Sequence, residues 1–481
     1  MKLSEILQNI KFKGEYNDIE ISNITYDSRK VKENSLFIAI SGENNDGHDY
    51  ILNAINKGAT AVIANGRAPI TDLVPIIQVK NPRKTMSEIA SNFYEHPSSK
   101  LKIIGVTGTN GKTTTTQIID YIIKFSRRTS SSLGTLGFNT PSGIISTGFT
   151  TPESIELQQI LKTISDGGIE YVPMEISSHA IELYRVNNVD VDIAIFTNLG
   201  YDHLDFHKTQ ENYFNSKLKL FTNLKRKSIA ILNYDDERTE KITKKIICNF
   251  ETYGFNKKAN LYVKKYSLGI DKTIIKFKYK DTSFNIQTRL IGKFNISNIA
   301  AAILCCIKID IPINIIKESF KFFNNVPGRL QSYKSTNNNT AIIDYAHTPD
   351  AFENIFENIS LLKKPQQKII SVFGCGGNRD KSKRSLMGSI ACSYSDLIYI
   401  TNDNPRFEPE DEIINDICHN LDKGKYKIIK NREKAIIEAL SKSKNSIILI
   451  LGKGVEKYQI IKNKKIPYSD IDIVKKYIDE N

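Results

Sequence analysis

The stretch that most constrains this chain runs from Gly105 to Thr114 and reads GVTGTNGKTT. An apolar run, Leu101 to Val106, precedes it, and apolar residues recur at helical spacing from Thr113 to Phe125. Strand, glycine loop and helix form the context of a phosphate-binding loop, in which backbone N–H groups and a helix N-terminus face the phosphates. We expect Lys112 to reach the terminal phosphates and the Thr113 hydroxyl to hold Mg²⁺. The stretch therefore predicts a site for a nucleoside triphosphate.

The glycine spacing departs from the common G-x-x-x-x-G-K-[ST] form. Val106 stands five positions before Gly111, and the glycine lies at Gly108 instead, which gives a tighter G-x-x-G-K-T loop. A glycine-rich turn that binds nothing is the alternative. Lys112 and Thr113, so close after an apolar strand, favour the ligand-binding loop.

The net charge of +14 and the sequence pI near 9.2 invite nucleic acid as a partner. However, the lysines are spread along the chain, and many stand beside Ile and Asn, as in Lys462-Asn463-Lys464-Lys465-Ile466. This bias, with no Trp, is typical of an A/T-rich genome rather than of a DNA-binding patch. A surplus of positive charge also suits an enzyme whose substrates are all anionic. We therefore expect no nucleic-acid partner.

The length of 481 residues favours several domains. No run approaches the ~20 uncharged apolar residues of a membrane helix, and the start of the chain lacks the apolar region of a signal peptide. The six cysteines form no C-x-x-C pair, and Cys305 and Cys306 are neighbours that could hardly bridge each other. This usage indicates reduced thiols, so we expect a cytoplasmic protein without a membrane segment.

Residues 1–97 form the first predicted domain, in which short apolar segments alternate with turn-forming clusters. The loop Tyr26-Asp27-Ser28-Arg29 precedes one such segment, Ser35 to Ile40. A hydroxyl and a guanidinium on a loop can bind a phosphate or a uracil edge. A solvated turn is the alternative for this loop.

Residues 98–327 form the second predicted domain, in which acids and histidines follow predicted strands. Glu175 follows the run Ile169 to Met174, and Asp202-His203-Leu204-Asp205-Phe206-His207 comes soon after the strand Val191 to Phe196. Open α/β sheets bind ligands at the carboxyl edge of their strands, so we expect a site there. The spacing is not that of a helical zinc pair, whereas Mg²⁺ prefers oxygen ligands and shares them with phosphates. We therefore expect Glu175 and His203 around nucleotide-bound Mg²⁺ and assign the other acids and histidines structural roles.

Two further features of this domain have more than one interpretation. Lys217 lies in the helix-like stretch Glu211 to Phe221, and its local pattern is that of a surface lysine. Asn295 and Asn298 stand three positions apart, on one helix face, where two amides suit an adenine edge. A helix start capped by Asn295 is the alternative.

Residues 328–481 form the third predicted domain, where apolar strands alternate with helical segments. The predicted strands are Ala341 to Ile343, Lys368 to Phe373, Leu397 to Ile400 and Ile447 to Leu451. A polar group follows each strand: Asp344-Tyr345-Ala346-His347, Gly374 to Asp380, Asp403-Asn404-Pro405-Arg406 and Gly452 to Glu456. This alternation predicts βαβ units and a parallel sheet, with all four groups on one edge. We expect the domain to close on the nucleotide and to bring a second substrate.

These motifs resemble those of the ATP-dependent Mur ligases of bacterial peptidoglycan synthesis. The matching segments span all three predicted domains: Gly108 to Thr114, Glu175 to His179, Thr197 to Leu199 with Asp202 to Asp205, Gly292 to Asn298 and Asp344 to His347. The tight glycine loop is the family's own form. The resemblance implies an α/β fold, with a three-domain Mur ligase architecture, a central P-loop ATPase-like parallel sheet and a Rossmann-like C-terminal domain. On this basis 1–97 would bind UDP, 98–327 ATP and 328–481 the incoming amino acid.

The resemblance also implies roles for single residues. Those that would hold the UDP-linked substrate are Ser28, Glu43, Asn44, Asn45, Thr150, Thr151, Ser178 and Arg185. Those that would bind ATP are Gly108, Thr109, Asn110, Gly111, Lys112, Thr113, Thr114, Asn295, Asn298, Arg329 and Asp344. Those that would bind the amino acid are Arg379, Asp403, Asn404, Pro405, Arg406, Gly452 and Glu456. The catalytic set would be Lys112, Glu175, His203 and Lys217, and the Mg²⁺ ligands would be Thr113, Glu175, His203 and a carbamylated Lys217.

Within the family the chain looks like the ligases that add the third residue of the peptide, through the Ser28 loop, Asp403 to Arg406 and Gly452 to Gly454. The implied substrates are ATP, UDP-N-acetylmuramoyl-L-alanyl-D-glutamate and meso-diaminopimelate, used by a monomer. An arginine at 406 can bind a second carboxylate bidentately, which favours meso-diaminopimelate over L-lysine.

There are two alternatives to this prediction, the first a ligase within the same fold and the second a protein of a different class. A folylpolyglutamate synthase-like ligase shares the phosphate loop but not the Asp-Asn-Pro-Arg loop. An ATP-switched binding protein would hydrolyse ATP without requiring an amino acid. Three positions depart from the family pattern: Asn378 stands where aspartate is usual, Val455 where histidine is common, and Leu183 where some relatives have glutamine.

Overall fold

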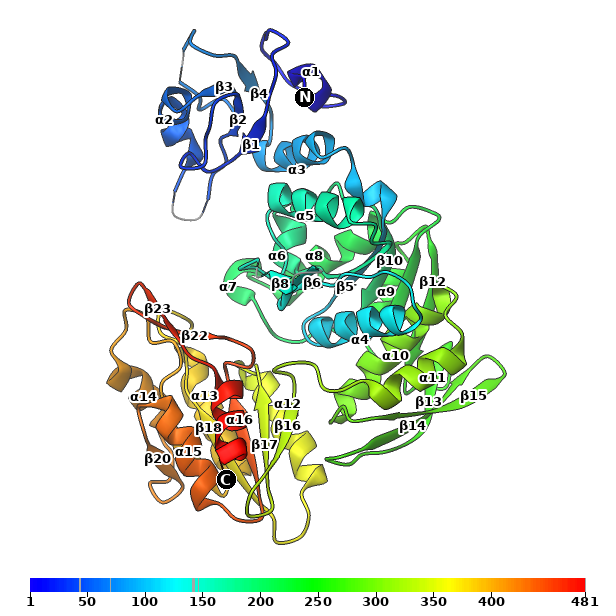
Figure 1. Cartoon of the computed structure of the whole chain (residues 1–481), viewed down its shortest axis with the longest axis vertical. Coiled ribbons are helices and arrows are strands. Elements are labelled where there is room, and N and C mark those ends of the chain that lie inside the picture. Colours follow the sequence, from blue (N-terminus) through cyan, green and yellow to red (C-terminus); the bar gives the residue numbers. More distant parts are fainter. Residues whose placement is uncertain (43–44, 70, 141–142, 146, 481) are drawn as a thin grey trace. The chain divides into compact units, whose positions relative to one another are not determined.

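The computed structural model describes residues 1–42, 45–69, 71–140, 143–145 and 147–480. The chain forms two compact units, whose elements are shown in Figure 1. Unit 1 comprises Met1–Leu261 and Ile299–Ile316, and unit 2 comprises Tyr262–Asn298 and Lys317–Asn481. The chain passes between the units inside β13 (Leu261–Ser267), α10 (Lys293–Lys308) and α11 (Ile313–Phe322). This division is not the predicted one into 1–97, 98–327 and 328–481, whose boundaries stay predictions.

The N-terminal part of unit 1 is a small parallel sheet in the order β1-β2-β3-β4, with helices on both faces. Leu36 and Ile38 of β2 face one apolar core, while Phe37 and Ala39 face the other, which explains an uninterrupted apolar strand. The elements are α1 (Leu3–Ile6), β1 (Asn23–Thr25), β2 (Ser35–Ile38), η1 (Gly47–Tyr50), α2 (Ile51–Asn56), β3 (Ala59–Ala64), β4 (Ile76–Gln78) and α3 (Pro82–Phe93).

The second part of unit 1 is built on the strand that precedes the glycine loop. That strand, β5, lies between β10 and β9 and pairs in parallel with both. The strands of this unit follow the order β12-β11-β10-β5-β9-β6-β7-β8. The loops after β5, β9 and β10 therefore meet at the carboxyl edge, as predicted. The elements are η2 (Pro97–Lys100), β5 (Lys102–Thr107), α4 (Lys112–Phe125), β6 (Leu133–Gly134), β7 (Gly137–Thr140), β8 (Gly143–Ile145), α5 (Ser154–Asp166), β9 (Tyr171–Glu175), α6 (Ser178–Glu182), β10 (Val191–Phe196), α7 (Leu204–His207), α8 (Gln210–Thr222), β11 (Ile229–Asn233), α9 (Arg238–Thr243) and β12 (Asn249–Gly254).

Unit 2 contains a second open sheet in the order β16-β17-β21-β18-β19-β20, parallel except at β16. Figure 1 shows the helices that surround it. Successive residues of β21 alternate between two cores: Ile447 and Leu449 pack with α12 to α14, while Ile448 and Ile450 pack with α15 and α16. The elements are β14 (Thr273–Tyr279), β15 (Thr282–Thr288), β16 (Gln331–Ser335), β17 (Asn339–Asp344), α12 (Pro349–Leu362), β18 (Lys368–Phe373), α13 (Ser382–Tyr394), β19 (Leu397–Ile400), α14 (Glu410–Cys418), β20 (Tyr426–Ile428), α15 (Arg432–Lys442), β21 (Ser446–Leu451), β22 (Tyr458–Ile461), β23 (Lys464–Pro467) and α16 (Asp470–Glu480).

This second sheet confirms the predicted βαβ arrangement. The four predicted strands are β17, β18, β19 and β21, and all run parallel. The four polar groups that follow them therefore lie on one edge of the sheet.

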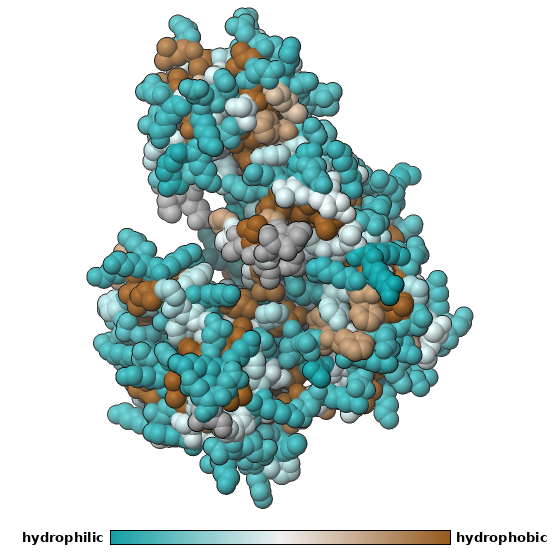
Figure 2. All heavy atoms as spheres, viewed as in Figure 1, coloured by the Kyte–Doolittle hydropathy of each residue, from teal (hydrophilic) through white to brown (hydrophobic). Residues whose placement is uncertain are grey.

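The surface is largely hydrophilic on the face drawn in Figure 2, where hydrophobic residues show as separated groups. None of the helices in the described ranges has the length and apolar character that crossing a bilayer requires.

Candidate active site

The glycine loop joins β5 directly to α4. Gly108 and Gly111 have φ angles of +151° and +86°, which side chains with a Cβ rarely adopt. A Cβ at Gly108 would also collide with the Thr197 hydroxyl. Because α4 begins at Lys112, its first N–H groups point toward the loop, where they can bind an anion.

The loop is held from the neighbouring strand β10. Asn110 N donates to Asn198 Oδ1 (3.0 Å), and Thr197 Oγ1 donates to Asn110 O (2.6 Å). Lys112 Nζ donates to the carbonyl oxygens of Gly108 and Thr109, both at 2.9 Å. The Lys112 ammonium therefore lies over the loop itself, where phosphates would be bound.

Glu175 lies beside Thr113 at the mouth of this loop. Thr113 Oγ1 donates to Glu175 Oε2 (2.9 Å), and Thr135 N donates to Glu175 Oε1 (2.8 Å). A Cβ at Gly134 would collide with the Glu175 carboxylate, so Gly134 leaves room for it. A hydroxyl and a carboxylate side by side at a phosphate loop fit Mg²⁺, which takes its remaining ligands from phosphates and water.

Protein ligands alone do not form a metal site in the ranges that the structure describes, since no three His, Cys, Asp or Glu side chains are grouped to hold a metal ion. The predicted ligand His203 is exposed and lies 3.4 Å from Asp202 Oδ2 through Nε2. Its ring contacts His179 edge-on, with centroids 4.7 Å apart. Desolvation by the neighbouring side chains lowers the pKa of His203, while Asp202 opposes that shift. His203 therefore favours the neutral form that a metal ligand or hydrogen-bonding group needs.

Lys217 is buried rather than on the surface, so the interpretation from its local pattern is wrong. It lies on the inward face of α8 with 1% exposure, and its Nζ lies 4.3 Å from the centre of the Tyr213 ring. Burial lowers the pKa of the Lys217 ammonium well below its ordinary value, and the cation of Lys112 lowers it further. The ring favours a charged ammonium, but desolvation of a fully buried cation is the larger effect. A neutral amine of this kind is the form that can react with CO₂.

The residues predicted to bind the UDP-linked substrate lie in two places. Thr151 and Arg185 meet: Arg185 Nη1 donates to Thr151 O (3.0 Å), and Arg185 Nη2 pairs with Glu153 (2.8 Å). Thr150 bonds to Thr135 (3.1 Å), and Ser178 bonds to His207 Nε2 (2.9 Å). Ser28 and Asn45 belong to the N-terminal part of unit 1, and Glu43 and Asn44 lie outside the described residues.

Four residues predicted to frame ATP belong to unit 2. Asn295 does not cap α10, because the helix begins at Lys293; instead Asn298 Nδ2 donates to Asn295 Oδ1 (2.9 Å). Asp344 accepts from the backbone N–H groups of Leu330 and Ala346, both at 2.7 Å. Burial raises the pKa of Asp344, and the nearby Arg329 opposes that rise. Because α10 begins before Asn295, at Lys293, the interpretation of Asn295 as a helix cap is wrong.

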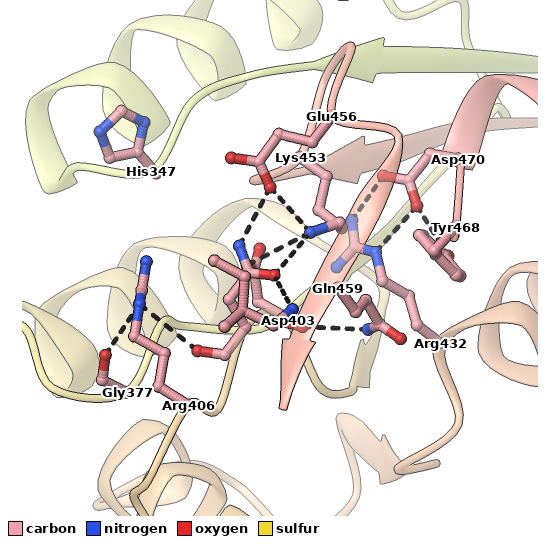
Figure 3. Close-up of polar contacts among 12 residues, drawn as sticks. His347, Gly377, Asp403, Arg406, Arg432, Lys453, Glu456, Gln459, Tyr468 and Asp470 are labelled. Atoms are coloured by element: carbon pink, nitrogen blue, oxygen red, sulfur yellow. Dashed lines mark hydrogen bonds and ion pairs between the residues drawn. The ribbon is translucent and has the colours of Figure 1, made fainter. Parts of the chain in front are cut away.

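The loops that carry the predicted amino-acid residues meet on the carboxyl edge of the second sheet, where Figure 3 shows Asp403, Arg406 and Glu456. Asn404 Nδ2 donates to Glu456 Oε2 (3.0 Å), which joins the loops after β19 and β21. Arg406 donates from Nη1 to Gly377 O (2.8 Å), which adds the loop after β18. Burial lowers the pKa of Arg406, and the neighbouring cation of Arg379 lowers it further. Two neighbouring guanidinium groups make a site for a carboxylate.

The backbones of Gly452 and Arg406 shape this edge. Gly452 has a φ of +112°, and a Cβ there would lie 2.8 Å from Asp403 Oδ2. Arg406 itself has a φ of +54°, which is unusual for an arginine, and its backbone pairs with β22 through Ile460 (3.0 Å). The turn that carries the Arg406 guanidinium is thus held by the close approach of Gly452 to Asp403 and by the hydrogen bond to Ile460.

Two charged residues of this region escape prediction from sequence. Arg384 is fully buried on α13, pairs with both oxygens of Glu408 (2.7 and 2.8 Å) and donates to Gly376 O (3.2 Å). Lys453 is fully buried beside Glu456 and Asn404. The only signal for Lys453 is its place between two glycines directly after a strand.

The three residues that depart from the family pattern, Asn378, Val455 and Leu183, are exposed or partly exposed. Asn378 Oδ1 accepts from Phe407 N (3.1 Å), so it still ties the loop after β18 to the one after β19. Val455 lies against Gly328, and Leu183 follows the last residue of α6. None of them interrupts the contacts between the loops described above.

Comparison with known proteins agrees with this geometry along the whole chain. The "Mur ligase family, catalytic domain" matches residues 20–94, the "Mur ligase middle domain" matches 106–306, and the "Mur ligase, glutamate ligase domain" matches 328–454. The chain belongs to the Mur ligase family. The predicted α/β fold class, with three domains and a central parallel-rich sheet, is thereby confirmed.

Individual relatives show which Mur ligases this chain is similar to. The chain is 44% identical over 98% of both sequences to the UDP-N-acetylmuramoyl-L-alanyl-D-glutamate–2,6-diaminopimelate ligase of Clostridioides difficile (strain 630). A solved structure of an enzyme with that name superposes with a TM-score of 0.71 at 27% identity, covering 100% of this chain and 99% of that one. The MurF ligase of Thermotoga maritima, solved in complex with ADP, has a TM-score of 0.63 at 21% identity, with 95% and 97% covered. This last likeness concerns the fold alone.

Proposed function

We propose that this protein is the ATP-dependent ligase that joins 2,6-diaminopimelate to UDP-N-acetylmuramoyl-L-alanyl-D-glutamate in peptidoglycan precursor synthesis. The relative that is 44% identical over 98% of both chains carries that name. One observation in the structure supports the choice of amino acid. Arg406 Nη1 and the Arg379 side chain both lie beside Gly376, and the cation of Arg379 lowers the pKa of Arg406 while the carboxylate of Glu456 raises it. Paired guanidinium groups with a facing acid suit an amino acid that carries a second carboxylate and a second ammonium.

We propose a reaction in two steps, through an acyl phosphate. A carboxylate oxygen of the glutamyl residue attacks the γ-phosphorus of ATP, the bond to the β-phosphate oxygen breaks, and ADP leaves. The amine of the third amino acid then attacks the acyl carbon, loses a proton and displaces phosphate. Lys112 and the N-terminus of α4 stabilise the negative charge that gathers on the transferring group.

We further propose that Thr113 and Glu175 hold Mg²⁺ with His203 and a carbamylated Lys217. Bound Mg²⁺ would supply charge neutralisation for the phosphates. The hydrogen bond between Thr113 and Glu175 supports this set, as does the buried Lys217 with its lowered pKa. A carbamate would turn Lys217 from a cation into an anion, which also removes its repulsion from Lys112.

The remaining assignments are proposals of the same kind. Thr150, Thr151, Ser178 and Arg185 would hold the UDP-linked substrate in unit 1, with Ser28 and the turn 43–45. Asn295, Asn298, Arg329 and Asp344 would frame ATP. We propose meso-diaminopimelate as the stereoisomer and a monomer acting in the cytoplasm, where the six free thiols would stay reduced.

The test is product formation with each substrate in turn. The protein is incubated with ATP, Mg²⁺, the UDP-dipeptide and one amino acid at a time, and products are identified by mass. We expect the tripeptide with meso-diaminopimelate and ADP formation that depends on the amino acid. ADP formation that is equally fast without any amino acid would support an ATP-switched protein instead.

A further inference from the structure

Lys453 is a fully buried lysine in the loop after β21, within the amino-acid site but outside the residues that the family pattern assigns to it. A buried ammonium is costly unless opposite charges and hydrogen-bond acceptors surround it. The position therefore needs an account of what Lys453 contributes.

The ammonium contacts both loops that bind the amino acid in our proposal. Nζ donates to Glu456 Oε2 at 2.8 Å and to Asn404 Oδ1 at 3.1 Å, and it pairs with Asp403 Oδ1 at 3.7 Å. Figure 3 shows Lys453 between Glu456 and Asp403. Asp403 and Asn404 follow β19, whereas Glu456 follows β21, so one buried cation joins two loops that are about fifty residues apart in the sequence.

These contacts fix the orientation of the Asn404 amide. Lysine can only donate, so the amide atom that faces it is the carbonyl oxygen. Oδ1 accepts a second hydrogen bond from Ile460 N (2.9 Å), and Nδ2 is directed to Glu456 Oε2 (3.0 Å). Loss of the ammonium would remove the donor that holds the carbonyl oxygen on this side.

The same contacts determine which carboxylate oxygen of Glu456 faces a ligand. Among the described residues, the hydrogen bonds of the Glu456 side chain, from Asn404 and Lys453, both end on Oε2. The side chain is 21% exposed, so Oε1 is the oxygen that can accept from an incoming ammonium.

We infer that Lys453 is a positioning residue for the amino-acid substrate: it fixes Asn404 and aims one oxygen of Glu456 at the ammonium of diaminopimelate. The inference rests on the proposed function, because it takes the loops after β19 and β21 as the amino-acid site. Lys453 acts through other side chains, since its Nζ contacts Asn404 and Glu456.

The test replaces Lys453 with a residue of similar length and no charge. For Lys453→Met we expect the KM for diaminopimelate to rise on the order of 10- to 100-fold, because one partner of a buried charge pair is lost. The KM values for ATP and for the UDP-dipeptide should stay unchanged, which a general loss of folded protein would not produce. The matched control is Lys457→Met, an exposed lysine in the same loop, and all its constants should stay unchanged.

The Lys453→Arg variant keeps a cation for Glu456 and Asp403 but changes the shape of the donor. We expect it to fold and to show a smaller, selective rise in the KM for diaminopimelate. If the folded Met variant keeps the wild-type KM for diaminopimelate, the inference is wrong. If the Met variant does not fold, the same result with the Arg variant overturns it. Wild-type enzyme that cannot use diaminopimelate at all would instead overturn the proposed function.

Discussion

The nucleotide loop of unit 1 and the amino-acid loops of unit 2 solve the problem of binding charge in different ways. The nucleotide loop is local: Gly108 to Thr113 supplies backbone N–H groups, a helix N-terminus and a lysine within a few residues. The loops that we propose bind the amino acid follow three separate strands, β18, β19 and β21, and are held by buried side-chain charges, among them Lys453 and Arg384.

This difference determines which substitutions each site tolerates. A backbone site depends on glycines and on conformation, so it tolerates little change in the loop but needs little from distant residues. A site made from buried ion pairs depends on every partner, because an unpaired buried charge is expensive. The two sites should therefore fail in different ways when single residues are changed.

The largest effect is expected in the nucleotide loop. Lys112→Ala should lower kcat for ADP formation about a thousandfold, because a cation next to the transferring phosphoryl group is removed. The fold should be intact, since Lys112 is not a core residue, and circular dichroism would check this. Lys124→Ala, an exposed lysine at the end of the same helix, is the control and should stay active. Wild-type turnover in Lys112→Ala would remove this residue from the mechanism.

The next largest effect is expected at Lys217, whose burial is the main local departure from a surface helix. Lys217→Ala should reduce kcat on the order of 100-fold or more, since a metal ligand would be lost. Intact-mass measurement or density of the wild type should show the equivalent of an added carboxyl group there, and removal of CO₂ and bicarbonate should lower activity. Lys219→Ala, on the exposed face of the same helix and paired with Glu182, is the matched control. An unmodified side chain pointing to solvent in a metal-loaded complex would contradict the proposal.

The amino-acid loops should show a more selective effect. Arg406→Ala should reduce kcat/KM for diaminopimelate on the order of 100-fold, because the substrate's second carboxylate would lose its bidentate partner. Binding of ATP, measured by calorimetry, should not change. Arg406→Lys keeps the charge without the planar fork and should recover only part of the loss. Equal loss of ATP binding in Arg406→Ala would mean that the two sites are not separate.

The smallest effect on activity is expected from the buried ion pair behind the amino-acid loops. Arg432 and Asp470 are fully buried or nearly so and are joined at 2.9 and 2.8 Å. Asp470→Asn should lower the free energy of unfolding by roughly 3 kcal/mol, because a buried cation loses its partner. The kinetic constants at room temperature should change little.

An exposed pair provides the control for that unfolding experiment. Asp271→Asn breaks a pair with Lys334 on the surface of unit 2, and the unfolding midpoint should not shift measurably. A large loss of activity in folded Asp470→Asn would show that this pair also shapes the binding loops.

Local pattern predicted the strand, glycine loop and helix around Gly108 well and the wider fold partly. The strand before Gly108 and the helix after it were clear because apolar period and glycine spacing are local signals. The parallel orientation of β17, β18, β19 and β21 follows from alternating strands and helices. This orientation places all four polar groups on one edge of the sheet. The strand order and the two compact units could not be predicted, since they depend on contacts between distant segments.

The local sequence pattern did not predict which charged residues are buried. Lys217 lies in a stretch with mixed polar and apolar neighbours, so its inward direction depends on how α8 packs. Arg384 is buried with Glu408 of the loop after β19 as its partner, which is 24 positions away along the chain. Lys453 is buried with two carboxylates as partners, that of the nearby Glu456 and that of the distant Asp403. Asn295 looked like a helix cap, but the helix starts earlier, at Lys293.

The most direct test of the account is the specificity of the wild-type enzyme for its amino acid. The values of kcat/KM for meso-diaminopimelate and for L-lysine are measured side by side, at saturating ATP and UDP-dipeptide. The account predicts a preference for meso-diaminopimelate on the order of 100-fold or more, because L-lysine would leave Arg406 and Arg379 facing no carboxylate. Faster reaction with L-lysine would contradict the central claim that these two arginines select the substrate.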